Sequence, residues 1–134
     1  MNRKELIKKQ QKEMIEEKGL IYLEDVSKSY STGVPAVKNM NLSIRPGEFV
    51  FRVGDSGSGK STLIKMLLRE LTATQGKVYV MGKDLGKLKR GQVAKYRREI
   101  GVVFQDFRLL NDRNVYENVA FAQRVIEVPA SEIR

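Results

Sequence analysis

Cysteine and histidine are both missing from the 134 residues of this chain. Without cysteine, the chain can form neither a disulfide framework nor a thiolate metal site. Without histidine, it lacks the side chain that most often serves as a general base or a transition-metal ligand near neutral pH. A divalent ion would therefore have to bind oxygen ligands, and oxygen ligands favour magnesium over zinc.

Long apolar runs are missing as well. No segment approaches the roughly 20 apolar residues of a membrane-spanning helix, and the basic N-terminus lacks the apolar stretch of a secretory signal. Positive charge is in excess, because 25 Lys and Arg residues against 16 Asp and Glu give a formal net charge of +9. That balance predicts either a polyanionic partner (a nucleotide, a nucleic acid or an acidic membrane surface) or a solvated basic surface.

The apolar pattern divides the chain near residue 20. Residues 1–19 are charged, with a weak apolar stripe, so we expect a helical or flexible lead outside the core. Residues 20–134 alternate between strand and helix patterns, which predicts an α/β fold with a parallel core sheet. Strand patterns fall at 20–23, 40–44, 49–53, 78–81 and 100–104, helical patterns at 60–71 and 115–126, and short surface helices are expected in the basic stretch 83–99. We expect the strands 49–53 and 100–104 to be buried.

A glycine-rich pattern follows the apolar segment 49–53. Residues 54–62 read GDSGSGKST, which fits the phosphate-binding pattern G-x-x-x-x-G-K-[ST]. An apolar strand before the loop and an amphipathic helix after it are the context that this pattern requires. Its glycines allow several backbone N–H groups to face one point, where the dipole of the following helix also favours an anion. The predicted nucleotide-binding residues are Gly54, Asp55, Ser56, Gly57, Ser58, Gly59, Lys60, Ser61 and Thr62.

The side chains at the end of this loop have distinct expected roles. Lys60 can place its ammonium between the β- and γ-phosphates of a nucleoside triphosphate. The Ser61 hydroxyl suits a magnesium ion, and Thr62 can support the α-phosphate side. The loop alone does not distinguish ATP from GTP, nor an ATPase from a GTPase or a kinase.

Two polar or aromatic residues outside the loop are further candidates. Tyr30 follows a predicted strand and can stack on a purine, although a tyrosine in this position is also explained by ordinary packing. Gln105 follows the segment 100–104, and the carboxyl ends of parallel strands are where such sheets bind ligands. Its amide oxygen could reach a magnesium ion or a water bound to it.

Together these features resemble the ABC transporter ATPases. Tyr30, GDSGSGKST and Val103-Phe104-Gln105 are similar to the A-loop, Walker A motif and Q-loop of that family, and the resemblance extends from about Ile21 to Arg134. It implies a P-loop NTPase fold of the ABC nucleotide-binding type, with ATP and Mg²⁺ as ligands. Tyr30 would then stack on adenine, and Ser61 and Gln105 would bind the magnesium ion.

Within that family, several stretches resemble the FtsE branch of bacterial cell-division ATP-binding proteins. They are GVPAVKNMNLSI, PGEFVF, STLIKMLLRE and IGVVFQDFRLLNDRNVYENVAFA. The resemblance implies a homodimer at the cytoplasmic face of the membrane, with an FtsX-like transmembrane partner that contacts residues 106–122. Such a complex controls septal peptidoglycan hydrolysis. The ATP-binding subunits of lipoprotein or macrolide exporters are the alternative.

Some features depart from the family pattern. Asp55 stands where a proline is usual, and Arg52 lies in a strand that is usually apolar. The chain has no LSGGQ-type signature, no Walker B aspartate–glutamate pair and no switch histidine, so we expect a domain truncated before those motifs, without a catalytic base. It would bind ATP without hydrolysing it, which leaves a pure nucleotide-binding module as a second hypothesis. Nucleic-acid binding by the basic stretch 83–98 matches no known motif.

Overall fold

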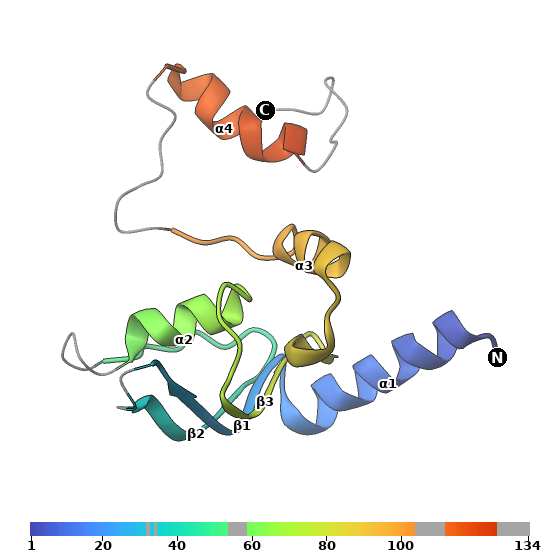
Figure 1. Ribbon diagram of the computed structural model, residues 1–134. Helices are drawn as coiled ribbons and strands as arrows, with labels where there is room; N and C mark the ends of the chain where they lie inside the picture. The colour runs from blue at the N-terminus through green and yellow to red at the C-terminus, as the bar shows by residue number, and fades with distance from the viewer. Residues whose placement is uncertain (32, 34, 54–58, 104–111, 126–134) are drawn as a thin grey trace. The chain divides into compact units, whose positions relative to one another are not determined.

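The computed structural model describes residues 1–31, 33, 35–53, 59–103 and 112–125, without the side chains of residues 122, 124 and 125. Figure 1 shows the elements along the chain, which divides into two compact units, Met1–Val93 and Ala94–Arg134. The elements are α1 (Arg3–Lys18), β1 (Ile21–Ser29), β2 (Pro35–Ile44), α2 (Lys60–Leu67), β3 (Gln75–Val80), β4 (Lys83–Asp84), the 3₁₀ turn η1 (Leu85–Lys87), α3 (Arg90–Arg97) and α4 (Val115–Val125).

The first unit contains a four-stranded sheet in the order β2-β1-β3-β4. Every neighbouring pair in this sheet is antiparallel, whereas the sequence pattern predicted a parallel core sheet. The strands predicted at 20–23, 40–44 and 78–81 are present in β1, β2 and β3. Strand orientation was predicted incorrectly for these elements because periodicity indicates which face is buried, not the direction of the neighbouring strand.

The central strand β1 is kinked at Asp25. Its pairing with both neighbours shifts register between Leu23 and Ser27, and Asp25 has a φ of 48°. Gly76 of β3 approaches closely there: a Cβ at Gly76 would lie 2.3 Å from the Asp25 carbonyl oxygen, and its φ is 83°. A β-bulge increases the local twist of the sheet, and the close approach and positive φ at Gly76 require glycine there.

The core of the first unit forms where α2 contacts β2 and β3. Its buried apolar side chains come from the sheet, from α2 and from the turns that follow them: Leu23, Val26, Val37, Leu63, Met66, Leu68, Val78, Val80 and Leu85. The helix predicted at 60–71 rests on the helical spacing of Ile64, Leu67, Leu68 and Leu71. Leu68 is buried as this stripe predicts, whereas Ile64 is exposed and Leu63 and Met66 face the core instead. Apolar residues occur on more than one side of this helix, so spacing alone identified the buried face only in part.

Helix α2 ends at Leu67, four residues before the predicted end at Leu71. The Arg69 N–H donates to the Met66 carbonyl and the Glu70 N–H donates to the Lys65 carbonyl at 2.8 Å, which is the double bond of a Schellman motif. Arg69 has a φ of 60°, where glycine is usual. Its Nε donates to the Leu85 carbonyl oxygen at 2.8 Å, so a tertiary contact holds the left-handed turn.

The segments expected to form buried core strands are not strands in the described structure. Residues 49–53 have no regular secondary structure, and Phe49, Phe51 and Val53 are 80 to 85% exposed. Residues 100–103 are likewise without strand structure, and Val103 is 94% exposed. No strand among the described residues pairs with either segment, whereas a strand buried on both faces requires neighbouring strands.

Three helices lie outside this core. In α1, the Asn2 side chain accepts from the Glu5 N–H and the Glu5 carboxylate accepts from the Asn2 N–H, which forms a capping box, and no residue of the helix is buried. Helix α3 falls in the basic stretch where a short helix was expected. Helix α4 occurs where predicted, although Val115 and Val119, two of the apolar residues whose spacing predicted it, are exposed. Among the described residues, no helix is both long and apolar enough to cross a membrane.

Candidate functional site

The last glycine of the phosphate-loop pattern begins helix α2. Gly59 is the N-cap residue with a left-handed φ of 83°. A Cβ there would lie 2.6 Å from the Ala36 carbonyl oxygen and 2.9 Å from Val37 Cγ2, so β2 lies directly against this turn. Both the backbone conformation and the close approach require glycine at this position.

This end of α2 is suited to an anion. Gly59 has no side chain that could cap the helix, and its carbonyl accepts from the Leu63 N–H at 2.9 Å as the helix begins. Backbone N–H groups in the first turn of a helix lack intrahelical partners, and the helix dipole is positive at that end. Lys60 and Ser61 occupy this turn, Lys60 half-buried and Ser61 exposed. Phosphate groups with a magnesium ion match this combination of donors and a hydroxyl.

The structure brings two predicted site residues together. The Tyr30 hydroxyl lies 3.1 Å from Thr62 Oγ1, within hydrogen-bonding distance, although 32 positions separate the residues in the sequence. Thr62 is buried in the first turn of α2, whereas Tyr30 is 41% exposed just beyond the end of β1. An aromatic ring therefore lies beside the helix that begins at the phosphate loop, with part of its surface accessible to a ligand.

Sequence reasoning missed a third side chain at this position. Lys28 Nζ lies 5.8 Å from the centroid of the Tyr30 ring, which is within the range of a cation–π contact. The signal was available, because residues two apart on an extended strand point to the same side. Lys28 thus belongs to the same local group as Tyr30 and Thr62.

Several predicted site residues lie outside the described part of the chain. They are the loop residues Gly54, Asp55, Ser56, Gly57 and Ser58, the magnesium candidate Gln105, and residues 106–111 of the partner segment 106–122. Arg52 is described, and it is exposed rather than buried in a strand. Its charge therefore reaches solvent, which removes the cost expected for a buried guanidinium.

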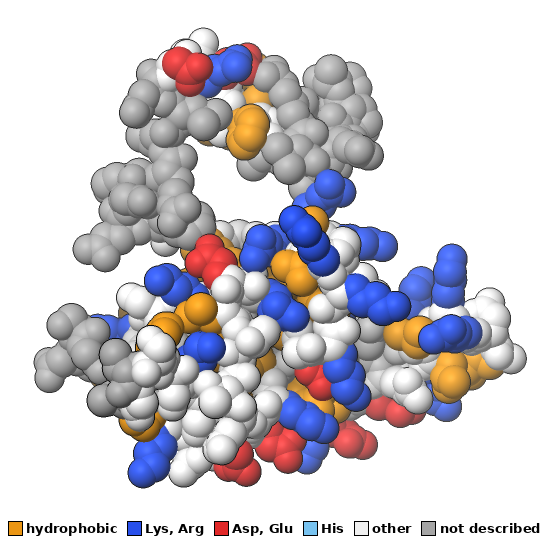
Figure 2. Space-filling view, in the orientation of Figure 1, with side chains coloured by type: hydrophobic (Ala, Val, Ile, Leu, Met, Phe, Trp, Pro, Cys, Tyr) orange, Lys and Arg blue, Asp and Glu red, His pale blue; other side chains and the backbone are white. Residues whose placement is uncertain are grey.

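The basic stretch 83–98 contains one buried aromatic residue. Burial raises the pKa of the Tyr96 phenol well above its usual range, and the nearby negative charge of Glu99 raises it further. Because Tyr96 is almost fully buried, its ring cannot stack on a nucleic-acid base. Figure 2 shows Lys and Arg side chains spread across the visible face instead of gathered in one place. That distribution favours a solvated basic surface over a nucleic-acid site.

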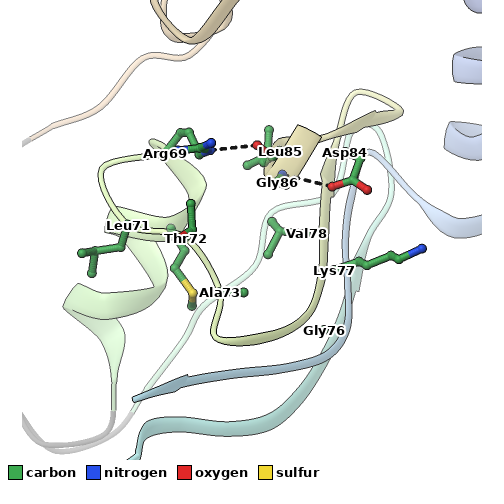
Figure 3. A pocket seen from close by; sticks show the side chains of 11 residues that line it. Arg69, Leu71, Thr72, Ala73, Gly76, Lys77, Val78, Asp84, Leu85 and Gly86 are labelled. Carbon is green, nitrogen blue, oxygen red and sulfur yellow. Dashed lines mark hydrogen bonds between the residues drawn. The ribbon is translucent and has the colours of Figure 1, made fainter. Parts of the chain in front are cut away.

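A cavity of about 260 Å³ lies at the end of α2 remote from Gly59. Figure 3 shows the Arg69 side chain at its rim, directed toward the Leu85 carbonyl, and the Asp84 carboxylate accepting from the Gly86 N–H. These polar groups are thus used within the fold. The cavity is lined by Met66, Arg69, Leu71, Thr72, Ala73, Gly76, Lys77, Val78, Asp84, Leu85 and Gly86. It shares no residue with the predicted nucleotide site.

Comparison with known proteins agrees with this arrangement. Residues 37–133 match the family model described as ABC transporter. The chain is 48% identical over 115 residues to the cell division ATP-binding protein FtsE of Bacillus subtilis, which covers 86% of this chain and 50% of that protein. It is 50% identical over 108 residues to the FtsE of Mycobacterium tuberculosis, covering 80% of this chain and 47% of the relative.

Solved structures give the same result. The dimeric structure of a bacterial ABC transporter cassette superposes with a TM-score of 0.75 at 38% identity, covering 82% of this chain and 49% of the cassette. A post-hydrolysis state of an ATP-binding cassette bound to ADP and Pi gives a TM-score of 0.74 at 37% identity, with the same coverage. The chain spans about half the length of the relatives that it matches. It has the P-loop fold of an ATP-binding cassette and belongs to the ABC transporter family.

Proposed function

We propose that this chain binds ATP with Mg²⁺ as the nucleotide-binding first part of an ABC-type ATPase subunit that acts in bacterial cell division. The observation that carries the proposal is the start of α2. There, the N-cap residue Gly59 has no side chain to cap the helix, Lys60 and Ser61 occupy the first turn, and Tyr30 lies alongside. The relatives called cell division ATP-binding protein FtsE support the cellular role.

The test of nucleotide binding is a matched pair of lysine substitutions in α2. Lys60→Ala should weaken ATP binding by roughly 10- to 150-fold, because a charge-assisted contact to phosphate contributes about 1.5–3 kcal/mol. Lys65→Ala removes an exposed lysine from the same helix and should leave the affinity unchanged. Titration with a fluorescent ATP analogue measures both variants. Equal affinities for all three proteins would refute the role of Lys60.

We also expect weak discrimination between ATP and GTP. The Tyr30 ring offers a stacking surface, and its hydroxyl lies at Thr62, so it does not read the edge of a base. Competition between the two nucleotides for the same labelled probe measures the preference. A preference of about a thousandfold, or roughly 4 kcal/mol, would require another group that hydrogen-bonds the base.

The proposed partner is an FtsX-like transmembrane protein, bound through residues 106–122 by a homodimer of the complete subunit at the cytoplasmic face of the membrane. An apolar cluster of Phe107, Leu109 and Leu110 directly after Gln105 supports this assignment, since apolar anchors dominate protein interfaces. Phe107→Glu should abolish co-purification with the partner while ATP binding stays intact. Loss of both together would identify Phe107 as a core residue and refute the docking role.

The 134-residue chain alone should not turn over ATP. Hydrolysis requires an oriented water and a proton acceptor in addition to phosphate neutralisation, and the sequence contains no Walker B glutamate or signature loop. The measurement is phosphate release by purified, folded protein, with Lys60→Ala as the control for contaminating ATPases. Turnover near about 1 s⁻¹ that disappears in the Lys60 variant would show that a base is present.

A further inference from the structure

The contact between Tyr30 and Thr62 joins two parts of the nucleotide site that sequence reasoning treated separately. Thr62 is buried in the first turn of α2 and its hydroxyl is 3.1 Å from that of Tyr30. Tyr30 lies outside β1, on the short connection to β2, where its backbone carbonyl accepts a turn hydrogen bond from the Gly33 N–H at 3.0 Å. A helix residue thus contacts a residue of a turn.

We propose that Thr62 is a positioning residue that holds the Tyr30 ring at a fixed distance from the first turn of α2, so that the base and the phosphates are aligned before the nucleotide binds. The inference rests on the proposed nucleotide-binding function. It assigns to Thr62 a role distinct from its predicted contact with the α-phosphate, and to the Tyr30 hydroxyl a role distinct from the stacking of its ring.

Burial decides which partner positions the other. Thr62 is 7% exposed and lies on a helix whose side chains pack into the core, whereas the Tyr30 ring is 41% exposed. The less constrained group is therefore the ring, and the hydrogen bond restricts the ring more than it restricts the threonine. Lys28, whose ammonium lies 5.8 Å from the ring centroid, adds a second and weaker restraint on the same ring.

Hydroxyl chemistry allows the bond to persist when nucleotide is present. The phenol O–H can donate to Thr62 Oγ1, and the threonine hydroxyl then keeps its own hydrogen for another acceptor. A phosphate oxygen next to the first turn of α2 would be such an acceptor. The two roles of Thr62 are therefore compatible, and a chain of hydroxyl groups strengthens each bond in it.

The main test uses Tyr30→Phe, which keeps the aromatic ring and removes only the hydroxyl. A ring without its tether should bind ATP about fivefold more weakly, the factor that corresponds to one ordinary hydrogen bond of roughly 1 kcal/mol. Inorganic tripolyphosphate has no base to stack, so Tyr30→Phe should bind it as tightly as the unsubstituted chain does. This difference between the two ligands separates alignment of the ring from a direct effect on the phosphate loop.

A double-mutant cycle provides the second measurement. Thr62→Val removes the threonine hydroxyl at nearly constant volume, and adding Tyr30→Phe to it should cause no further loss of ATP affinity. Thr62→Ser keeps a hydroxyl and should retain the unsubstituted affinity, with circular dichroism checking the fold of every variant. Additive losses in the cycle would overturn the inference, as would equal ATP affinity of Tyr30→Phe and the unsubstituted chain while Lys60→Ala binds weakly. Failure of the unsubstituted chain to bind either ligand would instead refute the proposed function.

Discussion

The sheet of the first unit and the segment 49–53 are both apolar in sequence, but the sheet contains buried apolar side chains and those of Phe49, Phe51 and Val53 are exposed. In β1, Leu23 and Val26 are completely buried, and the strand is hydrogen-bonded to β2 on one edge and β3 on the other. Phe49 and Phe51 pack against each other with ring centroids 4.9 Å apart, yet both remain highly exposed. The difference is that β1 pairs with two strands, whereas no strand among the described residues pairs with 49–53.

Helix α1 differs from the segment 49–53 in how its backbone hydrogen bonds are made. Helix α1 has no buried residue, like the segment 49–53, but it is regular over Arg3–Lys18. A helix satisfies its backbone hydrogen bonds internally, whereas a strand needs at least one neighbouring strand. An apolar segment with strand periodicity therefore predicts burial only when its neighbours are present as well.

Substitution of a core residue should give the largest effect. Leu23→Ala should lower the free energy of unfolding by about 2–5 kcal/mol, because it removes buried methyl groups and leaves a cavity at a fully buried site. Phe49→Ala deletes a larger side chain that is 83% exposed, and it should change stability by less than about 0.5 kcal/mol. Urea titration followed by circular dichroism compares the two. Equal losses would mean that Phe49 is packed in solution.

A pair of glycine substitutions tests the bulge in β1. Gly76→Ala should cost roughly 1–3 kcal/mol or more, because alanine is strained at a φ of 83° and its Cβ would meet the Asp25 backbone. Gly91→Ala, in open space in the first turn of α3, should stabilise that helix by at most about 1 kcal/mol. Thermal unfolding measures both variants. A stable Gly76→Ala protein would contradict the close approach of β3 to Asp25.

Removal of the capping box should affect α1 without affecting the sheet. Asn2→Ala should destabilise the helix by about 0.5–2 kcal/mol, since the Glu5 N–H loses its acceptor, the Asn2 side-chain oxygen. Gln10→Ala, an exposed change within the helix, is the control and should not reduce helicity. Amide exchange of residues 3–18 should accelerate in Asn2→Ala while that of β1 stays constant. Joint acceleration would show that α1 and the sheet unfold together.

The smallest change in stability is expected where the apolar side chains are most exposed. Phe49→Ser combined with Phe51→Ser should alter the free energy of unfolding by less than about 0.5 kcal/mol. The same change should reduce binding of a hydrophobic dye, because exposed apolar patches of this kind bind such probes and promote association. Unchanged dye fluorescence would indicate that the two rings are covered in solution.

The sequence pattern was sufficient to predict three strands and one helix of the first unit in their order, but it also predicted a strand at 49–53 that is not formed and did not predict β4. Strands at β1, β2 and β3 and the helix at α2 all follow from periodicity. The end of α2 could not be predicted, because its left-handed turn is formed by Arg69. Glycine at that position would have indicated a helix end, whereas the conformation of Arg69 is held by its contact with the Leu85 carbonyl. The antiparallel orientation was also missed, since Leu20–Leu23 has the same apolar pattern in either direction.

The individual residues of the candidate site were predicted from the sequence, but the contacts between them were not. Tyr30 and Thr62 were each assigned to the nucleotide, and nothing in the sequence indicates that their hydroxyl groups meet. The approach of β2 to Gly59 is likewise a tertiary contact with no local signal. The magnesium role of Ser61 and Gln105 and the phosphate contacts of residues 54–58 stay predictions.

The central position of β1 has a consequence for the order in which the site assembles. During synthesis, β1 can pair with β2 as a local hairpin, while pairing with β3 must wait until residues 45–74 have been made and looped out. Closing a loop of that length costs entropy before any contact compensates it, so we expect this step to be slower. Tyr30 lies in the early hairpin and Thr62 in the late loop. The end of the site that receives the base would then fold before the end that receives the phosphates.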